Sequence, residues 1–252
     1  MEWINNNSNQ GWDPAPADFT LSKREVHVWR ASLDVTVTER QQLARALTLN
    51  EWRRAQRFYF PSDRAHFITS RGLLRDILSR YQGVPPEHLH FGHNNFGKPF
   101  LVSLTGQDTL SFNISHSNAL LLVAITRCKS VGIDVEHVRS IENYKQIAQS
   151  TFSSQENAML LSLPAESRLE AFFTCWTRKE AFIKAIGEGL SYPLDRFVVS
   201  LTPGKPAAIL NLTGRVQKRS RWSLHALSPG PGYVGALAIE RCEGKLKFWQ
   251  YG

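Results

Sequence analysis

Apolar positions along the N-terminal part of the chain first follow a strand pattern and then two helical patterns. Val26 and Val28 alternate with polar neighbours as in a half-buried strand, and a helical pattern follows over 36–49. A stronger helix is predicted over 61–83, where apolar residues recur at spacings of three to five until glycine and a Pro-Pro pair end it. Short apolar runs between Gly, Asn and Ser then predict strands over 88–135.

The C-terminal part repeats this order, with helices first and strands afterwards. Helical periodicity returns over 143–148 and 154–163, and one long helix is predicted over 165–186, ending at Gly187. Short apolar stretches between turn residues follow and predict a closing antiparallel sheet: RFVVSLT, AAILNL, WSLHAL, GYVGALAIE and KLKFWQY. The repeated order predicts an α+β fold with two lobes.

The same pattern sets the expected domain limits. The first residues are rich in Asn, Pro and Asp without periodicity, which predicts a flexible N-terminal arm over 1–24. An N-terminal lobe is expected over 25–130 and a C-terminal lobe over 131–252.

Composition narrows the class of protein but not its activity. With 252 residues, 42% hydrophobic and 21% charged, the chain is neither disordered nor fibrous. The excess of 30 Lys and Arg over 22 Asp and Glu gives a net charge of +8. Such a charge favours an anionic partner, which leaves nucleic acid, an anionic membrane, a phosphate-rich cofactor or an acidic protein open.

The cysteines and the N-terminal sequence indicate the cellular compartment of the protein. Three cysteines lie far apart without a CxxC pair, so local spacing gives neither a disulfide framework nor a thiolate zinc site. The N-terminus has no signal-peptide pattern, and no apolar run is long enough to span a membrane. We therefore expect a soluble, cytoplasmic protein in a reducing compartment.

The segment VGIDVE carries the first candidate chemistry. In an extended strand alternate residues share a face, so Asp134 and Glu136 would project together while Ile133 and Val135 point into the core. Paired carboxylate oxygens are typical ligands of Mg²⁺, which takes one or two carboxylates with waters and substrate phosphates. An ordinary solvent-facing strand would explain the same two residues.

The helix over 165–186 carries the second candidate. Trp176, Glu180 and Lys184 recur every four residues and form one stripe. An exposed Glu-Lys pair would explain two of them, but the aromatic residues around them indicate a largely buried helix. Ionisable groups on such a helix are usually paired or functional.

Two further patterns could bind phosphate. Ser115 and His116 end a predicted strand, and hydroxyl and imidazole donors there can hold a phosphate, although a plain turn explains them as well. Because neighbours on a strand point to opposite faces, these two residues are poorly placed as a nucleophile and base. Residues 51–80 also hold seven arginines, whose planar forks suit phosphate, and some of these would line a solvated helix face.

Four motifs occur together in a fixed order. They are Gly97-Lys98-Pro99, FNISHS at 112–117, GIDVE at 132–136 and WTRKEAFIKAIGEGL at 176–190. In this combination the chain resembles the 4′-phosphopantetheinyl transferase family, specifically its long, monomeric, surfactin-synthetase-activating type. The likeness extends from about residue 25 to the C-terminus.

The resemblance implies a fold and a reaction. The fold would be two similar α/β lobes related by pseudo-twofold symmetry, each a small, mostly antiparallel sheet with packed helices, and coenzyme A would bind between them. The N-terminal lobe would contact its nucleotide, and the C-terminal lobe would hold the metal site and the carrier protein. The reaction would move 4′-phosphopantetheine from coenzyme A to a serine of an apo acyl or peptidyl carrier protein of fatty-acid, polyketide or nonribosomal peptide synthases, releasing adenosine 3′,5′-bisphosphate.

The resemblance also assigns site residues. Mg²⁺ would be held by three carboxylates, Asp134, Glu136 and Glu180. Glu180 would also be the general base on the carrier serine, and Lys184 would lie over the pyrophosphate. The remaining coenzyme A contacts would come from Arg54, Arg71, Lys98, Ser115 and His116. One departure is Glu51, which stands where some relatives have a basic residue, so which N-terminal arginine contacts coenzyme A is open.

Two other functions remain to be tested against this one. A basic nucleic-acid-binding protein would explain the +8 charge, but the chain has no zinc-finger or RNA-recognition motif. A non-catalytic carrier-protein-binding module would bind without Mg²⁺ or coenzyme A. The sequence does not identify the carrier protein, nor whether Glu136 binds the metal directly, nor whether Mn²⁺ could replace Mg²⁺.

Overall fold

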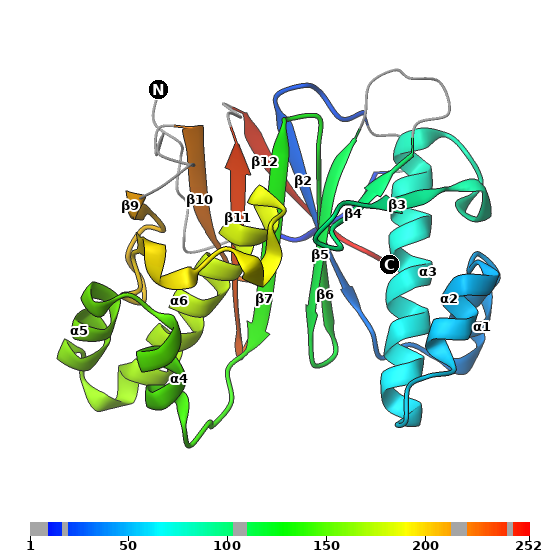
Figure 1. The fold of residues 1–252 in the computed structure, drawn as a ribbon. Coiled ribbons are helices and arrows are strands. Elements are labelled where there is room, and N and C mark those ends of the chain that lie inside the picture. The colour runs from blue at the N-terminus through cyan, green and yellow to red at the C-terminus, as the bar shows by residue number, and fades with distance from the viewer. Residues whose placement is uncertain (1–9, 17–19, 103–109, 213–220, 241–243) are drawn as a thin grey trace.

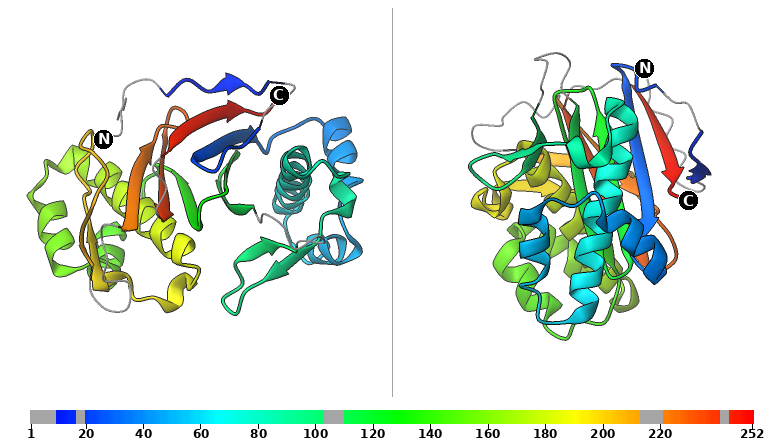
Figure 2. Two further views of the ribbon diagram at one scale, coloured as in Figure 1. Left: turned by 90° about the horizontal axis from the view of Figure 1, so that it is seen from above. Right: turned by 90° about the vertical axis from the view of Figure 1, so that its right-hand side faces the viewer.

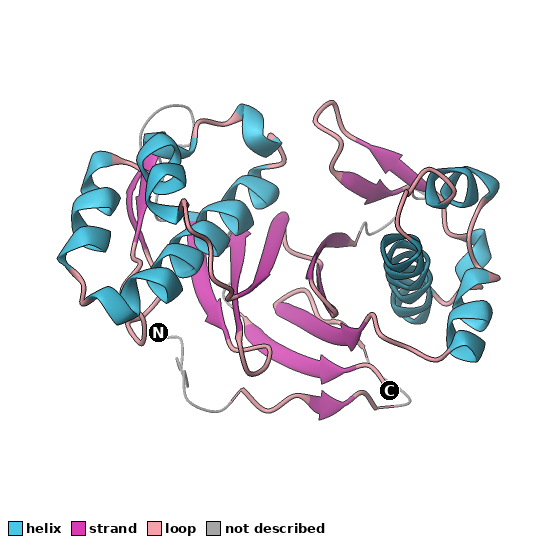
Figure 3. Ribbon diagram, turned by 90° about the horizontal axis from the view of Figure 1, so that it is seen from below, coloured by secondary structure: helices cyan, strands magenta, loops and turns pink. Residues whose placement is uncertain are grey.

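Two groups of helices lie at opposite ends of the molecule, with β-sheets between them (Figure 1). The computed structural model describes residues 10–16, 20–102, 110–212, 221–240 and 244–252. Figure 3 shows the same arrangement from below, with the strands running between the two helical groups. Within these described residues, no helix is both long and apolar enough to cross a membrane.

Up to residue 126, the described part of the N-terminal lobe consists of one long strand, three α-helices, one short 3-10 helix and four further strands. In chain order these are β2 (Glu25–Ser32), α1 (Val37–Ala44), α2 (Leu49–Ala55), α3 (Pro61–Gln82), η1 (Pro86–His88), β3 (Phe91–His93), β4 (Pro99–Leu101), β5 (Ser111–Ser117) and β6 (Leu120–Thr126). The sheet order is β2-β6-β5 with antiparallel pairing, and β3 and β4 form a separate hairpin.

The C-terminal lobe repeats this order of elements. Its members are β7 (Ser130–His137), α4 (Tyr144–Thr151), α5 (Ser154–Ser162), α6 (Ala165–Ile186), η2 (Gly189–Ser191), η3 (Leu194–Arg196), β8 (Phe197–Val199), β9 (Ile209–Leu212), β10 (Trp222–Leu227) and β11 (Tyr233–Glu240). The sheet order β7-β11-β10 matches β2-β6-β5 strand for strand, and β8 and β9 form the hairpin. The predicted α+β fold of two similar lobes is confirmed.

The two ends of the chain depart from the predicted domain limits. The last strand, β12 (Lys245–Gln250), runs parallel to β2 and so belongs to the sheet of the N-terminal lobe. Part of the expected flexible arm, β1 (Asp13–Pro14), pairs with β12, as Figure 2 shows from above. Trp12 contacts Phe248 edge to face, which fixes this part of the arm on the sheet. Residues 1–9 and 17–19 lie outside the described part.

The two lobes meet through strands β5 and β7 and through a shared apolar cluster. The side-chain oxygen of Asn113 on β5 accepts a hydrogen bond from the backbone N–H of Ile133 on β7, at 2.8 Å. Buried residues from both sheets form the cluster behind this seam: Val26, Val28, Leu122, Ala124, Val131, Ile133, Val135, Leu227, Leu237 and Ile239. The seam therefore brings strands from both lobes side by side.

Local sequence explains where the helices begin and end. The helix expected over 36–49 ends early, at Ala44, and a separate helix begins only at Leu49. Thr36 with Glu39 and Thr48 with Glu51 each form a capping box that starts one of these helices. The long helices α3 and α6 end as predicted. Gly187 adopts the left-handed conformation that closes α6.

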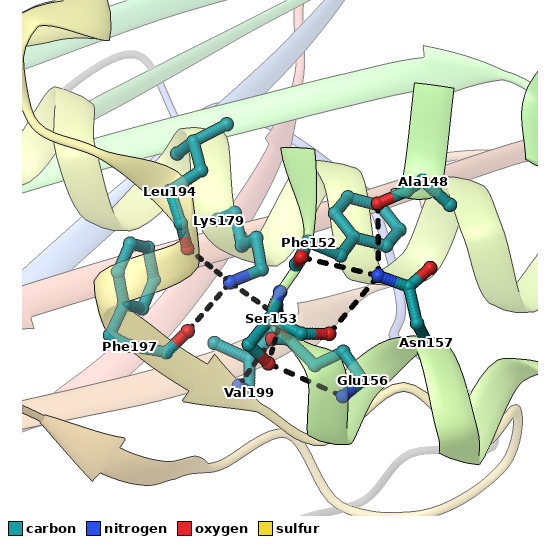
Figure 4. Close-up of polar contacts among 9 residues, drawn as sticks. All are labelled: Ala148, Phe152, Ser153, Glu156, Asn157, Lys179, Leu194, Phe197 and Val199. Atoms are coloured by element: carbon teal, nitrogen blue, oxygen red, sulfur yellow. Dashed lines mark hydrogen bonds and ion pairs between the residues drawn. The ribbon is translucent and has the colours of Figure 1, made fainter. Parts of the chain in front are cut away.

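A buried polar network fixes α6 against α5 and the β8 hairpin (Figure 4). Lys179 Nζ lies 2.8 Å from Glu156 Oε2, and neither side chain is exposed to solvent. The same ammonium donates to the carbonyls of Leu194 and Phe197 at 2.6 and 2.7 Å. Glu156 also accepts from the backbone N–H groups of Ser153 and Val199. Lys179 is therefore part of the structure of α6, whereas its neighbour Glu180 faces elsewhere.

The cysteines differ from the sequence expectation in one respect. Cys128 is disulfide-bonded, while Cys175 is a buried free thiol. Local spacing could not predict the bond, because no other cysteine lies near Cys128 in the sequence.

Candidate active site

Three elements from the two lobes meet at Asp134. This residue lies on β7, and its Oδ1 accepts hydrogen bonds from Ser115 Oγ on β5 at 2.7 Å and from Lys184 Nζ on α6 at 2.6 Å. Lys184 also donates to Ser115 Oγ at 3.0 Å. The ion pair of Lys184 is thus with Asp134 on β7 of the same lobe. It is not the exposed pair with Glu180 on its own helix that was the alternative explanation.

The carboxylates of β7 do not face solvent as in an ordinary amphipathic strand. Asp134 is only 4% exposed, and its Oδ2 atom is buried without a hydrogen-bond partner. Glu136 lies two residues further on the same face and accepts from Ser117 Oγ at 2.7 Å. Partial burial, and then the charge of Asp134, raise the pKa of Glu136. The predicted common face of these two carboxylates is confirmed by their parallel contacts with Ser115 and Ser117.

Glu180 completes an acidic group with the two residues of β7. Its pKa is raised to about 7, first by burial and then by the negative charge of Asp134, with a smaller contribution from Glu136, while the positive charge of Lys184 opposes the shift. Helix α6 can come so close to β7 because position 132 is glycine. A Cβ atom on Gly132 would lie 2.1 Å from the carbonyl oxygen of Ala181, which no side chain could tolerate.

A group of cationic side chains lies beside the acidic group. His116 follows Ser115 on β5, so its side chain points to the opposite side of the strand, as predicted, and it is exposed. Its pKa is lowered, first by loss of hydration and then by the positive charges of Lys184, His66 and Arg71. The guanidinium groups of Arg71 and Arg54 both lie over the ring of Phe67, at 5.6 and 5.4 Å from its centre. The arrangement is suited to an anion with several charges.

Sequence reasoning missed several members of this site. Asn113 and Ser117 share the strand face of Ser115, so a period of two along β5 could have revealed them. His66 was also missed. It lies on α3 with Nε2 2.8 Å from Asp34 Oδ1, and no local pattern joins these two residues in the sequence.

Glu51, the departure from the family pattern, and Lys98, a predicted coenzyme A contact, both have partners within the protein. Glu51 caps α2 and pairs with the buried Arg75 at 2.9 Å, so this acidic residue stabilises the N-terminal lobe. Lys98 donates to the carbonyl oxygens of Val131 at 2.9 Å and Ala185 at 3.3 Å, both in the C-terminal lobe. The structure thus brings Ser115, Asp134, Glu136, Glu180 and Lys184 together and places Lys98 at the lobe contact.

The acidic group fits a hard divalent cation. Among the described residues, no three His, Cys, Asp or Glu side chains form a ready-made metal cage. Mg²⁺ does not require one, because it is commonly held by one or two carboxylates together with waters and substrate phosphates. The unpartnered, buried Oδ2 of Asp134 beside two further carboxylates offers oxygen ligands of this kind.

Comparisons with known proteins identify the family of the chain. Residues 29–128 match the family model "4′-phosphopantetheinyl transferase, N-terminal", and residues 130–238 match the model "4′-phosphopantetheinyl transferase superfamily". The chain is 39% identical over 240 residues to 4′-phosphopantetheinyl transferase HetI of Nostoc sp., covering 95% of this chain and 98% of that protein. It is 33% identical over 148 residues to 4′-phosphopantetheinyl transferase Sfp of Bacillus subtilis, covering 59% of this chain and 63% of that protein. The chain belongs to the 4′-phosphopantetheinyl transferase family.

Proposed function

We propose that this protein transfers the 4′-phosphopantetheine group of coenzyme A to a serine of an apo carrier protein. The products would be the holo carrier protein and adenosine 3′,5′-bisphosphate. The observation that carries the proposal is the meeting of Asp134, Ser115 and Lys184 at the lobe interface, with Glu180 beside them. Family membership supports the same reaction.

Mg²⁺ is the metal that we propose for this site. Asp134, Glu136 and Glu180 would hold it, and the unpartnered Oδ2 of Asp134 supports this choice. The ion, when bound, would neutralise pyrophosphate oxygens and stabilise the departing adenosine bisphosphate.

The protein side chains would supply the remaining chemistry. Glu180 would accept the proton of the serine hydroxyl as the new phosphorus–oxygen bond forms and the bond to the leaving phosphate breaks. Lys184 would place its ammonium charge on the pyrophosphate oxygens, where negative charge increases in the transition state. Ser115, which already contacts both Asp134 and Lys184, would orient these groups.

The cationic group would bind the nucleotide part of coenzyme A. We propose that His116 and Arg71 contact the 3′-phosphate, because they lie close enough to influence one another electrostatically. Arg54 lies over the ring of Phe67, as Arg71 does, and would extend the phosphate-binding surface. The net charge of +8 would in addition attract an acidic carrier protein and speed the encounter at low salt.

The proposal is tested with a panel of apo acyl and peptidyl carrier proteins from fatty-acid, polyketide and nonribosomal peptide systems. Each is incubated with coenzyme A and Mg²⁺, and its intact mass is measured. A gain of one phosphopantetheine on at least one carrier is expected. Carrier binding without any mass change would instead favour a non-catalytic binding module. A monomeric state and a cytoplasmic location are also part of the proposal, and gel filtration with light scattering tests the first.

A further inference from the structure

The turn between β3 and β4 is held in shape by one side chain. Asn94 Oδ1 accepts hydrogen bonds from the backbone N–H groups of Phe96 and Lys98, both at 2.9 Å. The backbone N–H of Asn94 donates to the carbonyl of Lys98 at 3.0 Å, which closes the turn. These hydrogen bonds give the turn a defined shape, so it can hold a neighbouring element at a defined distance.

This turn contacts the end of α6 in the other lobe. Asn94 Nδ2 donates to the carbonyl oxygen of Gly187 at 2.7 Å, using the amide group that the turn does not need. A Cβ atom on Gly187 would lie 3.2 Å from Asn94 Nδ2 and 3.4 Å from Lys98 Cδ. The absence of a side chain at 187 thus allows the turn to reach the helix end.

Lys98 makes the second connection. Its ammonium donates to the carbonyl oxygens of Val131 on β7 and Ala185 on α6. Ala185 belongs to the last turn of α6, where carbonyl groups lack helical partners and a positive charge is favourable. Burial lowers the pKa of Lys98 to about 8.

The hydrogen bonds from Lys98 reach the place where β7 and α6, which carry the acidic group, meet. Val131 precedes Gly132, where the backbone of α6 lies close against β7. Ala185 follows Lys184 directly, and Asp134 lies three residues after Val131 on β7. A displacement of the β3–β4 turn would therefore change the spacing between Lys184 and Asp134.

We propose that Asn94 and Lys98 are positioning residues, which hold α6 on β7 from the N-terminal lobe so that Lys184 and Glu180 keep their places relative to Asp134. This inference rests on the proposed transferase function. It gives Lys98 a different task from the nucleotide contact that the family resemblance implies, since its ammonium group donates to two backbone carbonyls of the other lobe.

Two variants test the inference, Lys98→Met and Asn94→Ala. Each should lower kcat by about ten- to a hundredfold, because small displacements of reacting groups have effects of this size. The KM for coenzyme A should change little, and the ratio of KM values for coenzyme A and 3′-dephospho-coenzyme A should stay as in the unmodified protein. The double variant should lose no more than the worse single variant, since both residues act on the same helix end. Lys129→Met, at a lysine 72% exposed, serves as the control.

Amide hydrogen exchange gives a readout that does not need activity. Faster exchange at residues 183–187 in both variants, with the rest of the protein unchanged, would support the inference. A higher KM for coenzyme A but not for 3′-dephospho-coenzyme A in Lys98→Met, with Asn94→Ala unaffected, would overturn it in favour of a direct phosphate contact. Failure of the unmodified protein to transfer phosphopantetheine would refute the proposed function and leave the exchange result to decide on the connection.

Discussion

Replacing Lys179 by methionine should destabilise the protein strongly while leaving every proposed substrate contact in place. Lys179 is wholly buried, and Met has a similar length without the charge. The change would leave the carboxylate of Glu156 buried without its cation, and the carbonyls of Leu194 and Phe197 without their shared donor. Breaking a buried ion pair on one side costs about 3–5 kcal/mol.

The size of the effect is measurable by thermal and urea unfolding. A loss of about 3–5 kcal/mol corresponds to a fall in Tm of about 6–20 °C for a chain of this length. Adding Glu156→Gln to Lys179→Met removes the unpaired charge, so the double variant should regain part of the lost stability. Unfolding free energies that are simply additive across this cycle would refute the idea that the two charges stabilise each other.

Other predictions concern the site itself. Gly132→Ala should lower the unfolding free energy by about 1–3 kcal/mol and reduce transfer, because the added methyl group would displace α6 at Ala181; unchanged stability would contradict the close approach. His116→Ala should weaken binding of coenzyme A more than that of its 3′-dephospho analogue in calorimetry, and equal losses would remove the 3′-phosphate contact. His66→Ala should have the same selectivity with a smaller effect. Chelation by EDTA should stop transfer and added Mg²⁺ should restore it, whereas activity in excess EDTA would exclude the metal.

The helices were largely predictable because their signals are local. The Pro at the start of α3 and the glycines after α3 and α6 fix helix ends through backbone conformation alone. The separate helix α2, which the apolar pattern over 36–49 does not predict, also had a local signal, since Thr48 and Glu51 form a capping box at its start.

Sheet membership was not predictable to the same degree. The pattern of β12 indicates a strand, but its pairing with β2 joins positions such as Lys245 and Glu25 that are far apart in sequence. Pairing of this kind depends on which edge remains open after the rest of the chain has folded. The division of the chain near residue 130 therefore describes the order of elements better than the final assembly.

The candidate site was partly readable from residue types. Strand periodicity placed Asp134 and Glu136 on one face, and helix periodicity placed Glu180 and Lys184 on one stripe. Neither pattern could show that Lys184 pairs with Asp134, because that contact depends on how α6 crosses β7. The contact of Lys98 with the other lobe could not be predicted either, because it depends on how the two lobes pack together.

In the proposed function, Glu180 and Asp134 act together in phosphopantetheine transfer. The most direct test compares the unmodified protein with Glu180→Gln by intact-mass measurement of an apo carrier protein incubated with coenzyme A and Mg²⁺. We expect the unmodified protein to convert the carrier protein to the holo form and Glu180→Gln to give no conversion above background. Circular dichroism should show that both proteins are folded. Conversion at the same rate by both proteins would contradict the proposed function.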